Sequence, residues 1–325
     1  MFLLWSLLGP SLNSVAEACS KMKVLVVARC KHGRYAPFIT EQVEAIEKQG
    51  VECQFFGVDG KGIAGYLRQL PRLRKAIREY RPDIIHAHYG LCGLLANYQR
   101  RIPVVTTYHG SDINDPRVLR LSKRSIRRSG FNIFVSQKNV DIAHPWKDFA
   151  LIPCGIDLED YPIIDKAEAR QLMGLNPSGK YVLFAGAFDN PVKNAPLAKA
   201  AMELVPEAKL LELKGYTRTQ VATLMQAVDA FLMTSLTEGS PQVIKEAMAC
   251  GCPIVSVDVG DVRERIEGIE GCFLSERDPE ALARTIKNSL AHGDRTQGRA
   301  TIEKNRLSND IIAARIISVY ERLLS

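Results

Sequence analysis

The feature that most constrains this chain is the alternation of short, continuously apolar runs with amphipathic helical segments. Runs such as KVLVVA (23–28), YVLFAG (181–186) and DAFLMTS (229–235) lack the alternation of polar and apolar residues found in a sheet with one solvated face. Strands covered by helices on both faces have this continuous pattern. The strand-helix-strand order therefore predicts parallel, doubly wound α/β sheets.

With 325 residues the chain is too long for one ordinary core, because single cores stop growing near about 250 to 300 residues. The strand pattern ends near residue 155 and restarts at residue 181, after the turn cluster at 176–179. We predict two Rossmann-like domains, 22–165 and 166–308, that face a central cleft. Residues 309–325 are predicted to form an amphipathic helix, and the pattern leaves open which domain it covers.

The first ten residues, MFLLWSLLGP, are apolar, but no Lys or Arg precedes them and the run is far shorter than the ~20 residues of a membrane span. Met22 directly precedes the first predicted strand. We therefore expect residues 1–21 to be a dispensable extension, and leave open whether it is translated or cleaved. No later segment is long and apolar enough to cross a bilayer.

The eight cysteines lack the paired C-x-x-C spacing of structural zinc sites and the density of a secreted disulfide scaffold. They are Cys19, Cys30, Cys53, Cys92, Cys154, Cys250, Cys252 and Cys272. We expect thiols in a reducing compartment, with the cytosol as the default location. No D-x-D sequence is present, so we expect no metal site for a diphosphate.

The net charge of +7 is concentrated in two basic segments, 68–81 and 117–128. The first has leucines and an isoleucine at helical spacing, which predicts an amphipathic helix with a cationic face. An ordinary solvated helix face is one interpretation, and attraction to anionic lipid or to an anionic acceptor is the other. We do not expect nucleic acid as a partner, because no nucleic-acid-binding motif accompanies the charge.

Functional residues of open α/β sheets follow the carboxyl ends of strands. One such segment, TSLTEGSPQVIKEAMACG (234–251), contains Glu238 and, eight positions later, Glu246. Ser240 suits a helix N-cap, Pro241 the first helical position and Gly251 the residue beyond the helix. The start of such a helix favours a phosphate or a sugar oxygen.

Several segments together resemble the retaining glycosyltransferases of family 4, which have the GT-B fold. The E-x7-E segment from Glu238 to Glu246 carries this resemblance first. LIPCGID (151–157), AGAFDNPVKN (185–194), DIIHAHYG (83–90) and VVTTYHGSD (104–112) resemble further family segments in the same order. The resemblance extends from Met22 to about Gly271.

The resemblance implies a nucleotide-diphosphate sugar as donor and co-substrate. Glu246 would bind the ribose hydroxyls and Glu238 would face the transferred sugar. The turn of Gly239, Ser240 and Pro241 would offer backbone N–H groups to the sugar or the phosphates.

Three further residues receive roles from the resemblance. Lys193 would neutralise the diphosphate leaving group, as an ammonium can. His109, which follows a predicted strand, would project toward the transferred sugar, and Gly33 would approach the donor in the first loop. His86 and His88 lie two apart in a strand with no third ligand nearby, so we expect a structural or acceptor-side role rather than a metal site.

The chain departs from the family pattern at two places. Ala187 and Phe188 occupy the positions where the family commonly has an Arg that clamps the diphosphate, and Arg218, Lys214 and Arg34 are the candidates to replace it. The first loop holds only Gly33 where the family often has paired glycines, so close backbone approach to phosphate is less assured there.

We therefore expect a retaining, metal-independent transferase of the hexosyltransferase type, with no cofactor beyond the donor. The expected acceptor is a glycan or a lipid-linked molecule in cell-surface polysaccharide or glycolipid synthesis, at the cytoplasmic face of a membrane. A GT-B-fold sugar-nucleotide epimerase and a non-catalytic sugar-nucleotide-binding protein are the alternatives. No G-x-G-x-x-G follows either first strand, which argues against a nicotinamide enzyme.

Overall fold

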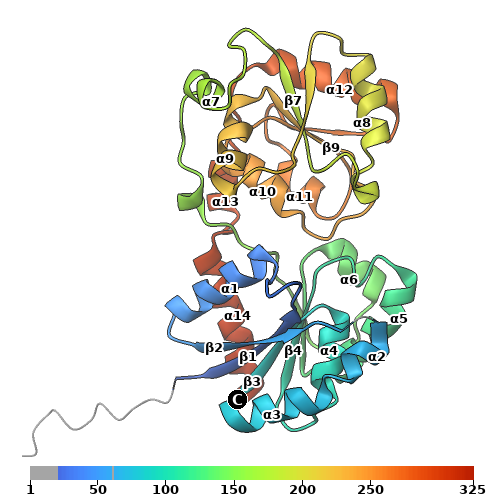
Figure 1. The fold of residues 1–325 in the computed structure, drawn as a ribbon, viewed down its shortest axis with the longest axis vertical. Helices are drawn as coiled ribbons and strands as arrows, with labels where there is room; N and C mark the ends of the chain where they lie inside the picture. The colour runs from blue at the N-terminus through green and yellow to red at the C-terminus, as the bar shows by residue number, and fades with distance from the viewer. Residues whose placement is uncertain (1–20, 61) are drawn as a thin grey trace, which may run out of the picture.

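A computed structural model describes residues 21–60 and 62–325 of the chain. It consists of two parallel sheets with helices on both faces, each in its own half of the molecule (Figure 1). The predicted fold class is thereby confirmed. The extension predicted for 1–21 lies, apart from its last residue, outside the described residues.

The first sheet has the strand order β2-β1-β3-β4-β5-β6, and every neighbouring pair is parallel. Its strands are β1 (Lys23–Arg29), β2 (Glu52–Val58), β3 (Ile84–His88), β4 (Val104–Tyr108), β5 (Phe131–Phe134) and β6 (Phe149–Leu151). Alternate residues of one strand enter different cores, since Val24 and Val26 of β1 pack on one face and Leu25 and Val27 on the other. This two-sided burial is the reason for the continuous apolar runs.

Helices connect these strands. They are α1 (Pro37–Lys48), α2 (Gly62–Leu67), α3 (Leu70–Tyr80), α4 (Gly90–Asn97), α5 (Pro116–Arg128) and α6 (Gln137–Ala143). The two predicted basic segments are therefore α3 and α5. The first helix begins at Pro37, and a proline is well suited to the first helical turn.

The second sheet has the order β11-β10-β9-β7-β8, again entirely parallel. Its strands are β7 (Tyr181–Phe184), β8 (Lys209–Glu212), β9 (Ala230–Met233), β10 (Ile254–Val257) and β11 (Phe273–Ser275). Its helices are α7 (Lys166–Leu172), α8 (Ala195–Glu203), α9 (Arg218–Ala227), α10 (Gln242–Ala249), α11 (Val262–Ile266), α12 (Pro279–His292) and α13 (Gly298–Lys304). Two single 3-10 turns, η1 (Leu158–Asp160) and η2 (Pro191–Lys193), lie in loops.

The last helix, α14 (Asn309–Leu324), returns to the first half of the molecule. Its buried residues Ile312, Ile316 and Tyr320 belong to the same core as β1 and α1. Figure 1 shows this red helix among the blue elements of the first sheet. The question that the sequence left open is thus answered, because α14 completes one face of the first sheet.

Two segments connect the halves and lie side by side. The Ile156 N–H donates to the Leu307 carbonyl at 3.0 Å, and the Asn309 N–H donates to the Ile156 carbonyl at 3.1 Å. We refer to the parts on either side of these connecting segments as the first and the second domain. The exact boundary at residue 165 remains a prediction. No helix within the described ranges is long and apolar enough to cross a membrane.

The packing of α14 leads to a stability prediction. Replacing Ile316 by Ala removes a side chain that is 2% exposed in the core of the first domain. We expect the free energy of unfolding to fall by about 2–5 kcal/mol, through lost burial and the cavity left behind. Urea unfolding measures this, and Glu321→Ala, on the exposed side of the same helix, is the control. Equal destabilisation by both variants would contradict the packing.

Candidate active site

The two domains meet backbone to backbone where a loop after β4 contacts a loop after β9. A Cβ atom on Gly239 would lie 2.1 Å from the His109 carbonyl oxygen, and one on Gly110 would lie 2.4 Å from the Gly239 Cα. Only glycine fits either position. The Asn114 amide fastens the contact by donating to Thr237 Oγ1 at 2.8 Å and to the Glu238 carbonyl at 2.9 Å.

A cavity of about 340 Å³ opens beside this contact and is lined from both domains. His109, Tyr89 and Phe38 line it from the first domain, and Glu238 and the turn 239–241 line it from the second. The structure therefore brings His109 and Glu238 together, although they lie 129 positions apart in the sequence (238 − 109). Both residues follow the carboxyl end of a parallel strand, as ligand-binding residues of such sheets do.

Lys193 is bound to Glu238 in the ligand-free chain. The Lys193 Nζ lies 2.7 Å from Glu238 Oε1, and both side chains are less than one fifth exposed, at 19% and 18%. The loop that carries Lys193 follows β7 and passes close to Gly186, where a Cβ atom would lie 3.0 Å from the lysine side chain. The ammonium and the carboxylate thus neutralise one another until a ligand competes for either of them.

His109 is held by a row of histidines. His88 Nδ1 and His109 Nε2 share a hydrogen bond of 3.0 Å, in which one ring nitrogen donates and the other accepts. His86 stacks on His88 with ring centroids 4.4 Å apart and is hydrogen-bonded to Tyr320 Oη at 2.6 Å and to Thr107 Oγ1 at 2.8 Å. His86 and His88 are therefore buried supports beneath His109, and no group of three metal-binding side chains occurs within residues 21–60 and 62–325.

Burial keeps these rings neutral. It lowers the pKa of His86 and of His109 to about 3, and for His109 the neighbouring charges of His86 and Lys245 add to the effect. The pKa of His88 lies well below its usual value for the same reason. At neutral pH His109 can therefore act as a hydrogen-bonding group, and it carries no charge toward an anionic ligand.

Ser240 does not cap α10, so that prediction is wrong. The helix begins after Pro241, and no side chain caps it. The Ser240 hydroxyl donates instead to Asp261 Oδ2 at 2.7 Å and accepts from the Lys245 ammonium at 2.9 Å. Because Lys245 is only 1% exposed, its ammonium needs these partners, and the hydroxyl serves it rather than the helix. Gly251 follows the helix with a φ of 61°, as expected.

Glu246 lies on α10 away from the cavity that contains Glu238. Its neighbours are Tyr161 and Arg218, both of which favour the charged carboxylate, while burial raises its pKa. Arg218 also pairs with Glu41 of the first domain and with Asp160. The two glutamates of the E-x7-E segment thus occupy separate environments about two helical turns apart.

Gly33 lies in an exposed turn between β1 and α1, with a φ of 75° and open space around it. It does not line the cavity with His109 and Glu238. The candidates for the missing arginine also lie elsewhere, since Lys214 pairs with Asp189 at 2.7 Å and Arg34 lines a different cavity. None of these three candidate cations lines the cavity of Glu238.

Sequence reasoning missed Asp112, Asn114 and Lys245. Asp112 accepts backbone N–H groups from Gly90 at 2.8 Å and from His109 and Gly110 at 3.0 and 3.1 Å, and so fixes the loop of His109. An Asp three positions after His109 is a signal for such a turn. Nothing in the local pattern indicates that Lys245 is buried, with its ammonium bonded to Ser240 Oγ at 2.9 Å and to Gln242 Oε1 at 3.2 Å.

Comparison with known proteins assigns this architecture to a family. The model of "Glycosyltransferase Family 4" matches residues 16–160, and the model of "Glycosyl transferases group 1" matches residues 181–292. The chain belongs to glycosyltransferase family 4. The resemblance read from the E-x7-E segment and its companions is thereby confirmed.

Curated relatives of this family 4 chain are distant in sequence. TuaC of Bacillus subtilis, named for teichuronic acid biosynthesis, is 26% identical over 239 residues, which are 64% of this chain and 61% of the relative. The D-inositol 3-phosphate glycosyltransferase of Mycolicibacterium gilvum is 24% identical over 281 residues, 68% of this chain and 61% of the relative. The match thus spans less than two thirds of these relatives.

Solved structures share the fold of the family 4 chain. Sucrose-phosphate synthase from Thermosynechococcus elongatus superposes with a TM-score of 0.82 at 18% identity, covering 93% of this chain and 99% of that one. Anabaena HepE in complex with UDP and glucose gives 0.68 at 18% identity, with 93% and 100% covered. At these identities the likeness establishes the GT-B fold.

The neutral histidine row makes stability depend on pH. The unfolded chain binds protons at histidine near pH 6.5 that folded His86 does not take up until about pH 3, so stability falls as the pH is lowered through this window. Between pH 7 and pH 5 we expect His86→Gln to remove about 2 kcal/mol of this loss. Urea unfolding at pH 7, 6 and 5 measures it. The exposed His144→Asn should keep the wild-type slope, and equal slopes in all three proteins would refute a neutral His86.

Proposed function

We propose that this chain is a retaining glycosyltransferase that moves a sugar from a nucleotide-diphosphate sugar to an acceptor bound by the first domain. The observation that carries the proposal is the Lys193–Glu238 pair beside His109 in a cavity between the domains of a family 4 chain. Departure of the leaving group concentrates negative charge on a diphosphate. An ammonium in a partly buried site stabilises such charge much better than it would in water.

Ligand binding would exchange partners within the ion pair. The diphosphate takes the Lys193 ammonium, and the Glu238 carboxylate is released to accept hydrogen bonds from the hydroxyls of the transferred sugar. His109, held neutral, is close enough to the same sugar to donate or accept a hydrogen bond. The start of α10, which no side chain caps, adds backbone N–H groups for the phosphates.

Glu246 is proposed to bind the ribose. Burial raises the pKa of its carboxyl, while Arg218 and the Tyr161 hydroxyl favour the charged form and offset part of this effect. A charged carboxylate accepts hydrogen bonds from two adjacent hydroxyls at once. The separation of Glu246 from Glu238 agrees with a donor whose ribose and sugar lie at opposite ends of a diphosphate.

We propose that charge on the diphosphate is neutralised by Lys193 and the dipole of α10 rather than by a metal ion. The absence of a D-x-D sequence supports this. We also propose a cytoplasmic protein that touches anionic membrane through α3 and α5. The exposed cations of α3 are Arg72, Arg74, Lys75 and Arg78, and those of α5 include Arg117, Arg120 and Arg124. The relative named for teichuronic acid biosynthesis agrees with an acceptor in cell-surface glycan or glycolipid synthesis.

A donor panel tests the transferase activity. Thermal shift with UDP-, GDP- and ADP-sugars should identify one base that stabilises the chain, because a ligand that binds only the folded state raises its melting temperature. Incubation of that donor with and without an acceptor mixture follows. Transfer with retained anomeric configuration, seen by NMR, is the expected result. A changed sugar released from donor alone would indicate the epimerase, and no turnover at all would leave only binding.

Two variants separate the proposed roles. Lys193→Ala should lower kcat by about 10²-fold or more, because Lys193 acts mainly on the charge that develops in the transition state. Glu246→Ala should raise the Kd of the nucleoside diphosphate about tenfold and lower kcat less. The exposed Lys180→Ala and Glu203→Ala are matched controls. Wild-type kinetics in both site variants would remove this assignment.

A further inference from the structure

A second cavity, of about 650 Å³, lies in the first domain. It is lined by residues between Arg29 and Val118, and none comes from the second domain. Two of its residues, Tyr89 and Ser111, also line the cavity of Glu238. The two cavities are therefore neighbours, and a ligand in the larger one can present a group to the smaller.

Three cations line this cavity. Arg29, Lys31 and Arg34 come from the end of β1 and the loop after it, and all three are exposed. Within the described part of the chain their side chains have no ion pair and no hydrogen bond. Burial raises the pKa of Tyr66 to about 12 and also raises that of Tyr89. The positive charge of Arg29 acts on both tyrosines in the opposite direction, since it favours their charged forms.

The cavity's described carboxylate does not neutralise these cations. Asp112 lines the wall, but its two oxygens accept the three backbone N–H groups of Gly90, His109 and Gly110. Burial raises the pKa of this carboxyl to about 6, so at pH 7 it offsets at most one of the three positive charges. The cavity therefore keeps a positive excess without a described partner.

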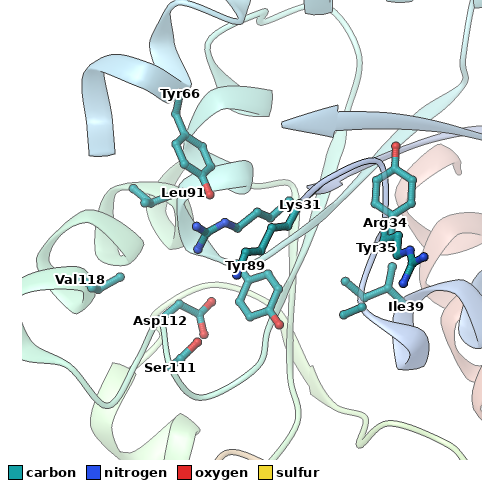
Figure 2. Close-up of a pocket in the computed structure, with 12 residues that line it drawn as sticks. Lys31, Arg34, Tyr35, Ile39, Tyr66, Tyr89, Leu91, Ser111, Asp112 and Val118 are labelled. Carbon is teal, nitrogen blue, oxygen red and sulfur yellow. The ribbon is translucent and has the colours of Figure 1, made fainter. Parts of the chain in front are cut away.

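Aromatic and aliphatic side chains form the remaining walls. Tyr35, Tyr66 and Tyr89 present rings, and Leu91 and Val118 add apolar surface. Figure 2 shows Lys31 between Tyr66 and Tyr89 in this view, with Arg34 beside Tyr35 and Ile39, and Asp112 and Ser111 below. Sugar rings pack on aromatic faces while their hydroxyls bond to polar groups, so such a wall suits a glycosyl unit.

We infer that this cavity binds the acceptor and that the acceptor carries an acidic group, a phosphate or a carboxylate. Arg29, Lys31 and Arg34 hold the acid, since guanidinium groups match the oxygens of both anions. The tyrosines hold the sugar or the body of the molecule. The hydroxyl to be glycosylated points past Tyr89 and Ser111 toward Glu238. The part of this inference that calls the ligand an acceptor rests on the proposed function. The binding of an acidic group in the cavity does not rest on it.

The binding test uses the full chain and small probes. Glucose 6-phosphate and glucuronate are titrated by calorimetry against neutral glucose. We expect each acid to bind at least about tenfold more tightly than glucose, and this preference to shrink as salt is raised from 50 to 500 mM. Equal affinities for acids and glucose overturn the inference.

A matched pair of variants locates the site. Arg29→Gln, Lys31→Gln and Arg34→Gln together should abolish the preference for the acids. Lys180→Gln, Arg284→Gln and Lys287→Gln remove the same charge from exposed positions of the second domain and should leave it intact. All six residues are exposed, so both triple variants are expected to fold, and Lys31→Glu alone is a second probe of the cavity. An equal loss in both triple variants indicates a general charge effect and overturns the site.

Two further arms distinguish other anions. If the cavity variant weakens UDP, GDP or ADP binding as much as glucose 6-phosphate binding, the cations serve the donor and the inference fails. If it loses binding to phosphatidylglycerol vesicles but retains the preference for acids, the cations serve a lipid surface and the inference fails. An inactive chain that keeps the acid preference contradicts only the transferase proposal, whereas an active chain without this preference contradicts only the acid site.

Discussion

The approach of Gly110 to Gly239 is the contact on which the site depends. Two sheets, each with ligand-binding loops at its own strand ends, form one site only if their loops come within reach of each other. A Cβ atom at Gly239 or Gly110 would lie only 2.1 or 2.4 Å from the backbone of the other domain, so the domains would have to move apart. His109 and Glu238 adjoin these glycines directly, so the same contact that joins the domains also sets the spacing of the groups proposed to meet the sugar.

An ion pair between Lys193 and Glu238 lies next to this contact. A lone carboxylate or a lone ammonium in the partly buried loops would carry a desolvation cost, which the pairing of Lys193 with Glu238 offsets. In the function that we propose, the donor offers each of them a new partner, a phosphate for the lysine and hydroxyls for the glutamate. Binding would then exchange the partners within the ion pair.

The fold could be predicted because strands covered on both faces leave a local mark, the continuous apolar run. For the candidate site, the sequence indicated individual residues but not which of them contact one another. Lys193 and Glu238 are 45 positions apart, and their pairing depends on how two loops fold over the sheet. The prediction that Ser240 caps the helix was wrong because its hydroxyl donates to Asp261 and accepts from the buried Lys245 instead. A capping rule based on neighbouring residues does not take such partners into account. The apolar stripe of α14 indicates that the helix packs on a core, but it does not indicate which of the two domains provides that core.

The position of α14 in the first domain also affects the order in which the two domains can complete their cores during synthesis. The residues of the first sheet are synthesised long before residues 309–324, yet the core around Val24 and Ile84 includes Ile312, Ile316 and Tyr320. Until residues 309–324 have been synthesised, one face of the first sheet lacks α14 as its cover. The second domain, whose cores lie within residues 156–307, can close earlier. The first domain is therefore synthesised first, but its core is completed after that of the second domain.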